Sequence, residues 1–446
     1  MAADWIEKAS RHRFGRIRGR KMTEWLLDLV GDDLEKQLEC AKMLDRLRSV
    51  HPPPPEGDEP VDIERHWARI DAAVRTALKR RTFPRREFVR QLVKNYEATL
   101  RHRQKQAVWM MDGKTKLIGK DRMGLFMAYG WVFGALGEEL LDAENLLRRQ
   151  INGRLSGDVG KALQRMGPAG RVFLPQALRR LDAGNIKWNP WTPALAAIVG
   201  DDVEAIAQVV ERLGASDYEP PPPWRPGMPG RAPSQAHNRI FGTLQTLSLV
   251  GAPARPVPGV LEKIEALVDY FAPEAVEALG AVGADDLAVL EKLEGYTRAT
   301  EWNQQAGAIL GLAHFPAHAE RVVPRLADLL YSFEEQDGDW MYAGDHERVL
   351  KSLGAYGEKA LPALETLDEL GYFDIKKHWD HEEQRSFFVF LGDLGTAASE
   401  RALEKLEELV ATRYRGDEQE LAEDLPDARR DYISMLWALR RLRGEI

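Results

Sequence analysis

The sequence predicts an all-α protein, an α-solenoid built from repeated helical hairpins. Two observations carry the prediction. Apolar residues recur at helical spacing, and no strand pattern of any length appears in the 446 residues. The apolar stripe over 349–353 ends at Gly354, and the next stripe begins with Pro362 in its first turn. Glycine past one helix end and proline at the next start predict two tightly joined, antiparallel helices.

The same pattern returns along the chain. Gly167 and Pro175 hold the corresponding places in an earlier hairpin, and the turn 31–33 (Gly-Asp-Asp) separates an apolar stripe from a second helix over 34–47. Four later glycines mark the ends of apolar stripes at spacings of 31, 43 and 38 residues: Gly280, Gly311, Gly354 and Gly392. Paired helices at such a period are typical of solenoids.

At these residues the chain resembles the HEAT-repeat family, especially its short bacterial form, which also occurs in phycobilisome-lyase-type repeats. The resemblance covers most of the chain from Thr23 to Leu442. It implies degenerate two-helix units stacked side by side. Members of the family act mostly as scaffolds, so the resemblance implies architecture far more than activity.

Charge and proline content predict three regions. Residues 1–22 are a basic N-terminal tail, and 23–125 are basic helical repeats with a proline-rich linker at 51–60. Residues 126–446 are an acidic repeat array with a proline-rich loop at 216–234. The first 125 residues hold 28 Lys and Arg against 19 Asp and Glu, whereas the remainder holds 34 against 51. A basic quarter beside an acidic body is the main electrostatic feature.

Cysteine content and hydropathy favour the cytoplasm. Cys40 is the only cysteine, which fits a reducing compartment, and we expect it to be a buried thiol. The N-terminus lacks the apolar segment of a signal peptide. The uncharged run from Met123 to Gly137 is too short to span a membrane and predicts a buried helix instead.

The most basic tract runs from Lys79 to Lys105, where we expect a helix to start near Pro84. Arg86, Arg90, Lys94 and Arg101 would share one face of that helix, and another face would carry Phe88, Leu92, Asn95 or Tyr96, and Thr99. The candidate partner-binding residues of the tract are Arg80, Arg81, Arg85, Arg86, Arg90, Lys94 and Arg101. Such a stripe is consistent with a solvated face, with docking of an acidic protein surface, or with binding of nucleic-acid phosphates.

Tryptophans supply the remaining candidate binding residues, Trp340 and Trp379. They lie beside Asp339 and Asp380, and in residue type they resemble the aromatic clefts of HEAT-like alkylpurine DNA glycosylases. The alternative function is nucleic-acid binding through the basic N-terminal region, with the glycosylase-like chemistry that this resemblance implies. The acidic charge of this half disfavours DNA binding there, and we expect the tryptophans to pack in the core.

We expect no metal and no cofactor. The dipeptides 346–347 and 381–382 (His-Glu) resemble those of deoxyhypusine hydroxylase, a HEAT-like di-iron enzyme, but that family has four and this chain has two. The Gly-Lys-Thr at 113–115 lacks the spacing of a P-loop. The sequence therefore predicts a non-catalytic scaffold or adaptor with a protein partner.

Overall fold

The computed structural model describes residues 16–17, 20–49, 63–111, 120–152, 157–184, 191–214, 234–334, 345–373 and 381–395, with a few residues between 403 and 443. These residues confirm the predicted all-α class. Besides helices, they contain one short antiparallel sheet, in which β1 (Arg16–Ile17) pairs with β2 (Arg20–Lys21). The proline-rich segment 51–60 lies outside the described residues, as does 216–234 apart from Ser234.

Contacts between residues divide the chain into two units. Unit 1 comprises Met1–Pro53 with Ile63–Thr246, and unit 2 comprises Pro54–Asp62 with Leu247–Ile446. The division falls inside helix α12 (Gln235–Val250). The sequence places the boundary between the basic and acidic regions after residue 125, which lies inside α6 (Lys120–Ala135). Charge and packing therefore divide the chain at different places.

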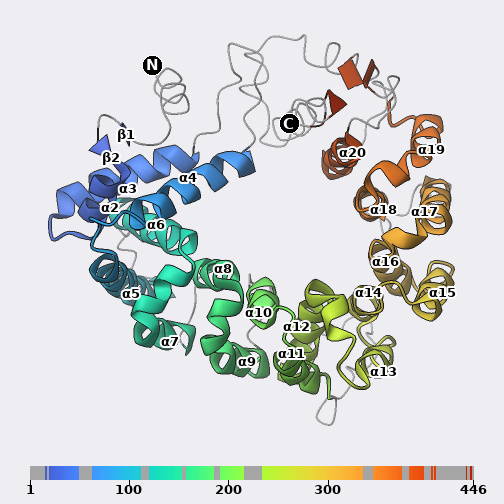
Figure 1. The fold of residues 1–446 in the computed structure, drawn as a ribbon, viewed down its shortest axis with the longest axis horizontal. Coiled ribbons are helices and arrows are strands. Elements are labelled where there is room, and N and C mark those ends of the chain that lie inside the picture. Colours follow the sequence, from blue (N-terminus) through green and yellow to red (C-terminus); the bar gives the residue numbers. More distant parts are fainter. Residues whose placement is uncertain are drawn as a thin grey trace. The chain divides into compact units, whose positions relative to one another are not determined.

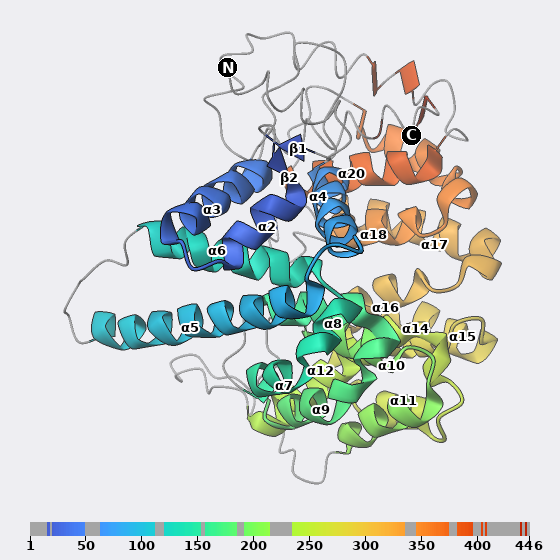
Figure 2. The same ribbon diagram turned by 60° about the vertical axis from the view of Figure 1, so that its left-hand side comes forward.

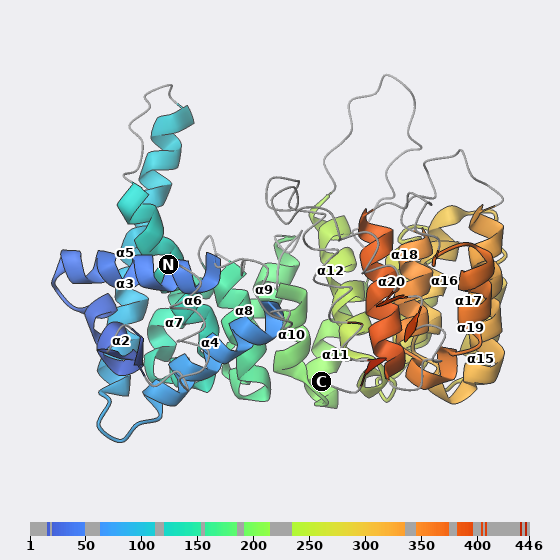
Figure 3. The same cartoon turned by 90° about the horizontal axis from the view of Figure 1, so that it is seen from above.

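Unit 1 is built from helices whose alternate members pack together. Its helices are α2 (Met22–Val30), α3 (Leu34–Ser49), α4 (Ile63–Leu78), α5 (Arg85–Met111), α6, α7 (Glu144–Asn152), α8 (Gly157–Met166), α9 (Leu174–Asp182), α10 (Trp191–Val199) and α11 (Val203–Val210). Helices α6, α8 and α10 form one row. Helices α5, α7 and α9 form a second row, which lies beside the first in Figure 1. The far end of α5 extends past α6 and α7 (Figure 3).

Unit 2 repeats this arrangement. Its helices are α13 (Val260–Glu265), α14 (Ala272–Val282), α15 (Leu287–Tyr296), α16 (Trp302–Leu312), α17 (Ala319–Glu334), α18 (Asp345–Gly354), α19 (Ala363–Glu369) and α20 (His381–Leu394). Here α14, α16, α18 and α20 contact one another in succession (Figure 2). Helix α17 contacts α19 (Figure 1). Short 3-10 turns join several helix pairs: η1 (Glu138–Ala143), η2 (Gly167–Phe173), η3 (Glu211–Leu213), η4 (Ala252–Ala254), η5 (Pro316–His318) and η7 (Gly357–Ala360).

A repeated turn connects three of the helix pairs. Asp33, Asp202 and Asp286 each precede a helix and accept hydrogen bonds from backbone N–H groups of its first turn, as N-cap residues do. Two of these aspartates also pair with an arginine 31 residues earlier: Asp202 with Arg171 at 2.7 Å, and Asp286 with Arg255. The same cap and the same ion pair therefore recur in both units.

Of the four glycines that the sequence predicts at helix ends, only one ends a helix. Gly354 is the last residue of α18, but Gly280, Gly311 and Gly392 lie inside α14, α16 and α20. The reason for two of them is a close helix crossing. A Cβ on Gly280 would lie 2.5 Å from the Cα of Gly311, so the two backbones touch where α14 crosses α16.

The uncharged run from Met123 to Gly137 forms most of α6 and the turn after it. Its described residues are almost all buried, with Ala128 and Phe133 each fully inaccessible. The prediction of a buried helix is confirmed. None of the helices in the described part of the chain combines the length and apolar character that crossing a bilayer requires.

Candidate binding surface

The described part of unit 1 carries seven exposed cations within sixteen residues. They lie in the turn 79–84 between α4 and α5 and along the first half of α5, and we call them the basic surface: Lys79, Arg80, Arg81, Arg85, Arg86, Arg90 and Lys94. Glu87 is the one acidic residue in the same stretch. Six of the seven predicted candidates of the tract are therefore exposed on one part of the fold, and Lys79 joins them.

The seventh predicted cation, Arg101, lies on α5, but its side chain is outside the described residues, so its contribution stays a prediction. Trp340 and Trp379 also lie outside the described residues.

Local packing presents these cations outward. The backbone N–H of Phe83 donates to the carbonyl of Arg80 at 2.9 Å, which closes the turn. The Phe83 ring is only 8% exposed and meets the edge of Phe88 at 5.2 Å. With Phe83 turned inward, Arg80 and Arg81 face solvent. The predicted helix start near Pro84 is confirmed, because α5 begins at Arg85.

The opposite face of α5 anchors it to unit 1. Phe88, Leu92 and Tyr96 are buried, as predicted, and Val89 and Val93 are buried beside them. The Tyr96 ring stacks on Phe133 of α6 at 5.3 Å. The 3.6-residue period places the apolar residues on this face and Arg86, Arg90 and Lys94 on the exposed one, as the sequence predicts.

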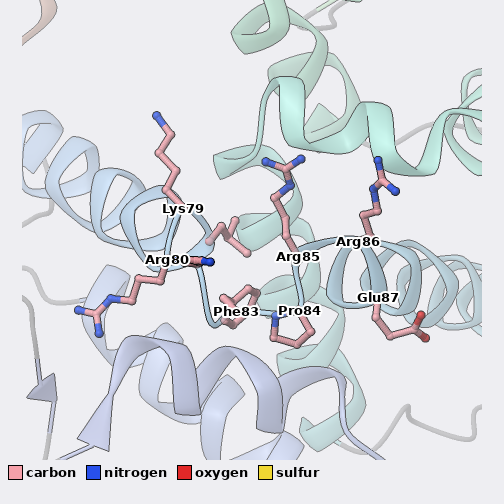
Figure 4. Close-up of a pocket in the computed structure, with 9 residues that line it drawn as sticks. Lys79, Arg80, Phe83, Pro84, Arg85, Arg86 and Glu87 are labelled. Atoms are coloured by element: carbon pink, nitrogen blue, oxygen red, sulfur yellow. The ribbon is translucent and has the colours of Figure 1, made fainter.

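A surface pocket of about 630 Å³ opens at the start of α5. Its lining runs from Leu78 to Glu87, apart from Thr82. Figure 4 shows the side chains of Lys79, Arg85 and Arg86 extending to the same side, whereas Arg80 points another way. Apolar atoms of Leu78, Phe83 and Pro84 complete the lining, so the pocket combines cations with a small apolar wall.

One carboxylate from another element pairs with two arginines of this lining. Asp142 of η1 accepts from the Nε of Arg85 at 2.9 Å, and its other oxygen lies 3.4 Å from the Nε of Arg86. The Asp142 side chain is 15% exposed, whereas that of Arg86 is 80% exposed. No other carboxylate in the described part of the chain forms an ion pair with the basic surface.

One further prediction is settled by packing. Cys40 is fully buried in α3 and donates to the carbonyl of Trp25 at 3.1 Å, and burial raises the pKa of its thiol to about 12. The prediction of a buried thiol is confirmed. The Gly-Lys-Thr segment at 113–115 lies outside the described residues.

One histidine of the two His-Glu dipeptides can be placed with its partners. His346 of α18 meets α20 through Glu383, with 2.6 Å between Nδ1 and Oε1, and Tyr372 donates to the same oxygen at 2.6 Å. The side chain of His381 lies outside the described residues. Within the described residues no group of three or more His, Cys, Asp or Glu side chains could hold a metal ion.

Comparisons with known proteins add little to this geometry. No family model matches the chain, and no curated protein matches it. One similar solved structure, described as the crystal structure of an engineered protein, is 14% identical over 94% of this chain and 98% of its own. Its TM-score is 0.33, too low to carry an argument about fold.

Proposed function

We propose that this protein is a non-catalytic scaffold of HEAT-like helical repeats that binds an acidic protein partner through the basic surface. The repeat architecture is supported by the alternate packing of helices within each unit. It is also supported by the recurring Asp cap, which pairs with an arginine one period earlier at Asp202 and at Asp286. Solenoids of this kind usually act as extended binding surfaces.

The single observation that carries the binding site is the cluster of seven exposed cations, to which the described residues supply one ion-pairing carboxylate, Asp142. These cations work against local stability. Arg85 and Arg86 occupy the first turn of α5, where the helix dipole favours negative charge. Arg86, Arg90 and Lys94 follow at spacings of four, so like charges are neighbours along the exposed face. These cations lower the stability of the helix and remain exposed to solvent. Binding of an anionic ligand is the best explanation for their presence there.

The contact with Asp142 favours protein over nucleic acid as the partner. In this contact, Arg85 and Arg86 bind a carboxylate at ion-pair distance within this fold. An acidic protein surface presents the same chemical group. Nucleic-acid binding through the same cations is the alternative, supported by the net charge of the first 125 residues.

The test compares two charge reversals of equal size. The first is Arg90→Glu/Lys94→Glu on the basic surface, and the control is Lys161→Glu/Arg179→Glu, which alters exposed cations elsewhere in unit 1. Each full-length variant is used to recover partners from the native cell. We expect an acidic protein that wild type and control retain and that the first variant loses.

Purified components then separate the two partner classes. Binding of labelled poly-L-glutamate and of labelled duplex DNA is titrated against salt for the same proteins. For DNA, the logarithm of affinity should fall with the logarithm of salt by about 0.9 per phosphate contact. Tight DNA binding at physiological salt, lost in the first variant, together with no loss of an acidic protein, would replace the scaffold proposal with the nucleic-acid alternative.

A further inference from the structure

Two arginines of the pocket lining at the start of α5 already bind an internal carboxylate, which lies outside that lining. Asp142 contacts both Arg85 and Arg86, at 2.9 and 3.4 Å. It comes from η1, 57 residues from Arg85 in the sequence. The site is positive for two reasons: the guanidinium groups themselves, and the N-terminal end of a 27-residue helix. An oxyanion is therefore stabilised there whichever molecule supplies it.

We propose that the Arg85–Arg86 pair is an oxyanion subsite of the basic surface, which Asp142 occupies until a carboxylate of the acidic partner displaces it. This inference rests on the proposed function, because it assumes an acidic protein at that surface. It adds a specific point of attachment and an internal competitor that limits the affinity of the surface for anions.

Displacement is feasible because both arginines remain open to solvent while they pair with Asp142, whose own side chain is 15% exposed. The side chains of Arg85 and Arg86 are 46% and 80% exposed, and ion pairs with such exposed cations contribute little to stability. Asp142 also lies on a six-residue 3-10 turn, not in the middle of a long helix. Movement of its side chain would leave the apolar contacts of α5 with α6 in place.

An incoming carboxylate would gain a contact that Asp142 does not make. Lys79 lies on the same side of the pocket as Arg85 and Arg86 (Figure 4). Within the described part of the chain Lys79 forms no ion pair, whereas Asp142 pairs only with the two arginines. A flexible acidic segment could reach all three cations, because its carboxylates are not fixed on η1.

The experiment is a double-mutant cycle with labelled poly-L-glutamate as the probe. Asp142→Asn removes the competitor and keeps the side-chain shape, and we expect about threefold tighter binding at low salt. Glu138→Gln is the matched control: it removes one negative charge from an exposed position on the same turn that forms no ion pair with either arginine. We expect the control to give a clearly smaller gain.

The second arm of the cycle repeats Asp142→Asn in an Arg85→Gln/Arg86→Gln background. If Asp142 competes for these two arginines, its removal no longer tightens binding once they are gone. Equal gains from Asp142→Asn and Glu138→Gln would contradict the inference, as would a gain that persists in the arginine-free background. So would weaker binding with a lower Tm for Asp142→Asn, since that result identifies the ion pair as a clamp that fastens η1 to α5.

The outcomes also separate this inference from the proposed function. If Arg90→Glu/Lys94→Glu abolishes binding of poly-L-glutamate and of the cellular partner but Asp142→Asn has no effect, the subsite is wrong and the scaffold proposal stands. If wild type binds no poly-L-glutamate and the charge reversal loses no partner, the proposed function has failed and this inference fails with it.

Discussion

The basic surface of unit 1 and the α14–α16 crossing of unit 2 are opposite kinds of structure. The first consists of long, exposed side chains whose charges pair with one carboxylate of the described residues, Asp142. The second consists of glycines whose missing side chains let two backbones touch, Gly280 against Gly311. The crossing leaves no room for a Cβ on Gly280, whereas the cations of the basic surface extend into solvent. Substitutions should therefore affect stability at the crossing and binding at the surface.

The largest expected effect is at the crossing. A methyl group at Gly280 would lie 2.5 Å from the Cα and 2.6 Å from the carbonyl oxygen of Gly311, and backbone atoms move only if α14 and α16 separate. We expect Gly280→Ala to destabilise unit 2 by about 3 kcal/mol. Urea unfolding followed by circular dichroism measures the change.

Gly295 provides the matched control for that prediction. It lies in α15, and a Cβ there meets nothing within 4 Å. Gly295→Ala should stabilise the protein by about 0.5–1 kcal/mol, because alanine restricts the unfolded chain and favours helix. Similar losses from both substitutions would show that the close crossing does not exist.

The second prediction concerns the repeated cap. Asp286 accepts from the N–H of Ala288 at 2.9 Å and also pairs with Arg255. Asp286→Ala should cost about 1–2 kcal/mol, whereas Asp286→Asn keeps the cap and should cost less than half as much. Thermal unfolding of both variants separates the cap from the ion pair. An alanine variant as stable as wild type would contradict the role given to this turn.

Sequence reasoning succeeded where a pattern is local. The start of α5 at Arg85, its apolar face at Phe88 and Leu92, and its exposed face at Arg90 all follow from a 3.6-residue period and one proline. Those features depend only on residues within a few positions of each other, so a single sequence contains them.

Sequence reasoning failed where the cause lies in a distant element. Gly280 was interpreted as a helix end, but its role depends on Gly311, 31 residues away. Asp142 was not singled out, because nothing near it in sequence indicates Arg85, 57 residues earlier. The 31-residue spacing, which matches the repeat period, could have suggested that Gly280 meets Gly311. No local sequence signal could have suggested that Asp142 meets Arg85.

The third prediction uses pH to examine a charge that is buried, unlike those of the basic surface. Desolvation raises the pKa of Glu277 on α14, and Ser248 donates to it only at 3.5 Å. A carboxyl with a raised pKa in the folded state contributes most to stability below its unfolded pKa, and that contribution is lost as the pH rises through the folded pKa. At pH 7 the charged form is therefore unfavourable in this position.

Glu277→Gln should consequently raise Tm at pH 7 by about 1–2 °C, and the gain should shrink as the pH is lowered toward about 4. Differential scanning calorimetry across this pH range tests the sign. A glutamine variant that is less stable than wild type at pH 7 would mean that the attraction of Lys351 outweighs desolvation.

The smallest expected effect on stability is at the basic surface, which contrasts most strongly with the α14–α16 crossing. Arg90 has like charges four residues away on both sides, Arg86 and Lys94, and an opposite charge three residues before it, Glu87. Each such pair contributes about 0.2–0.5 kcal/mol with the sign of its charges. Arg90→Glu converts two repulsions into attractions and one attraction into a repulsion, so we expect Tm to stay the same or rise by about 1 °C.

The same substitution should weaken binding of poly-L-glutamate, because it places a negative charge in the middle of the basic surface. A variant that is at least as stable as wild type but binds more weakly would show that Arg90 serves the partner and not the fold. A clear loss of stability would instead give Arg90 a structural role and remove it from the basic surface.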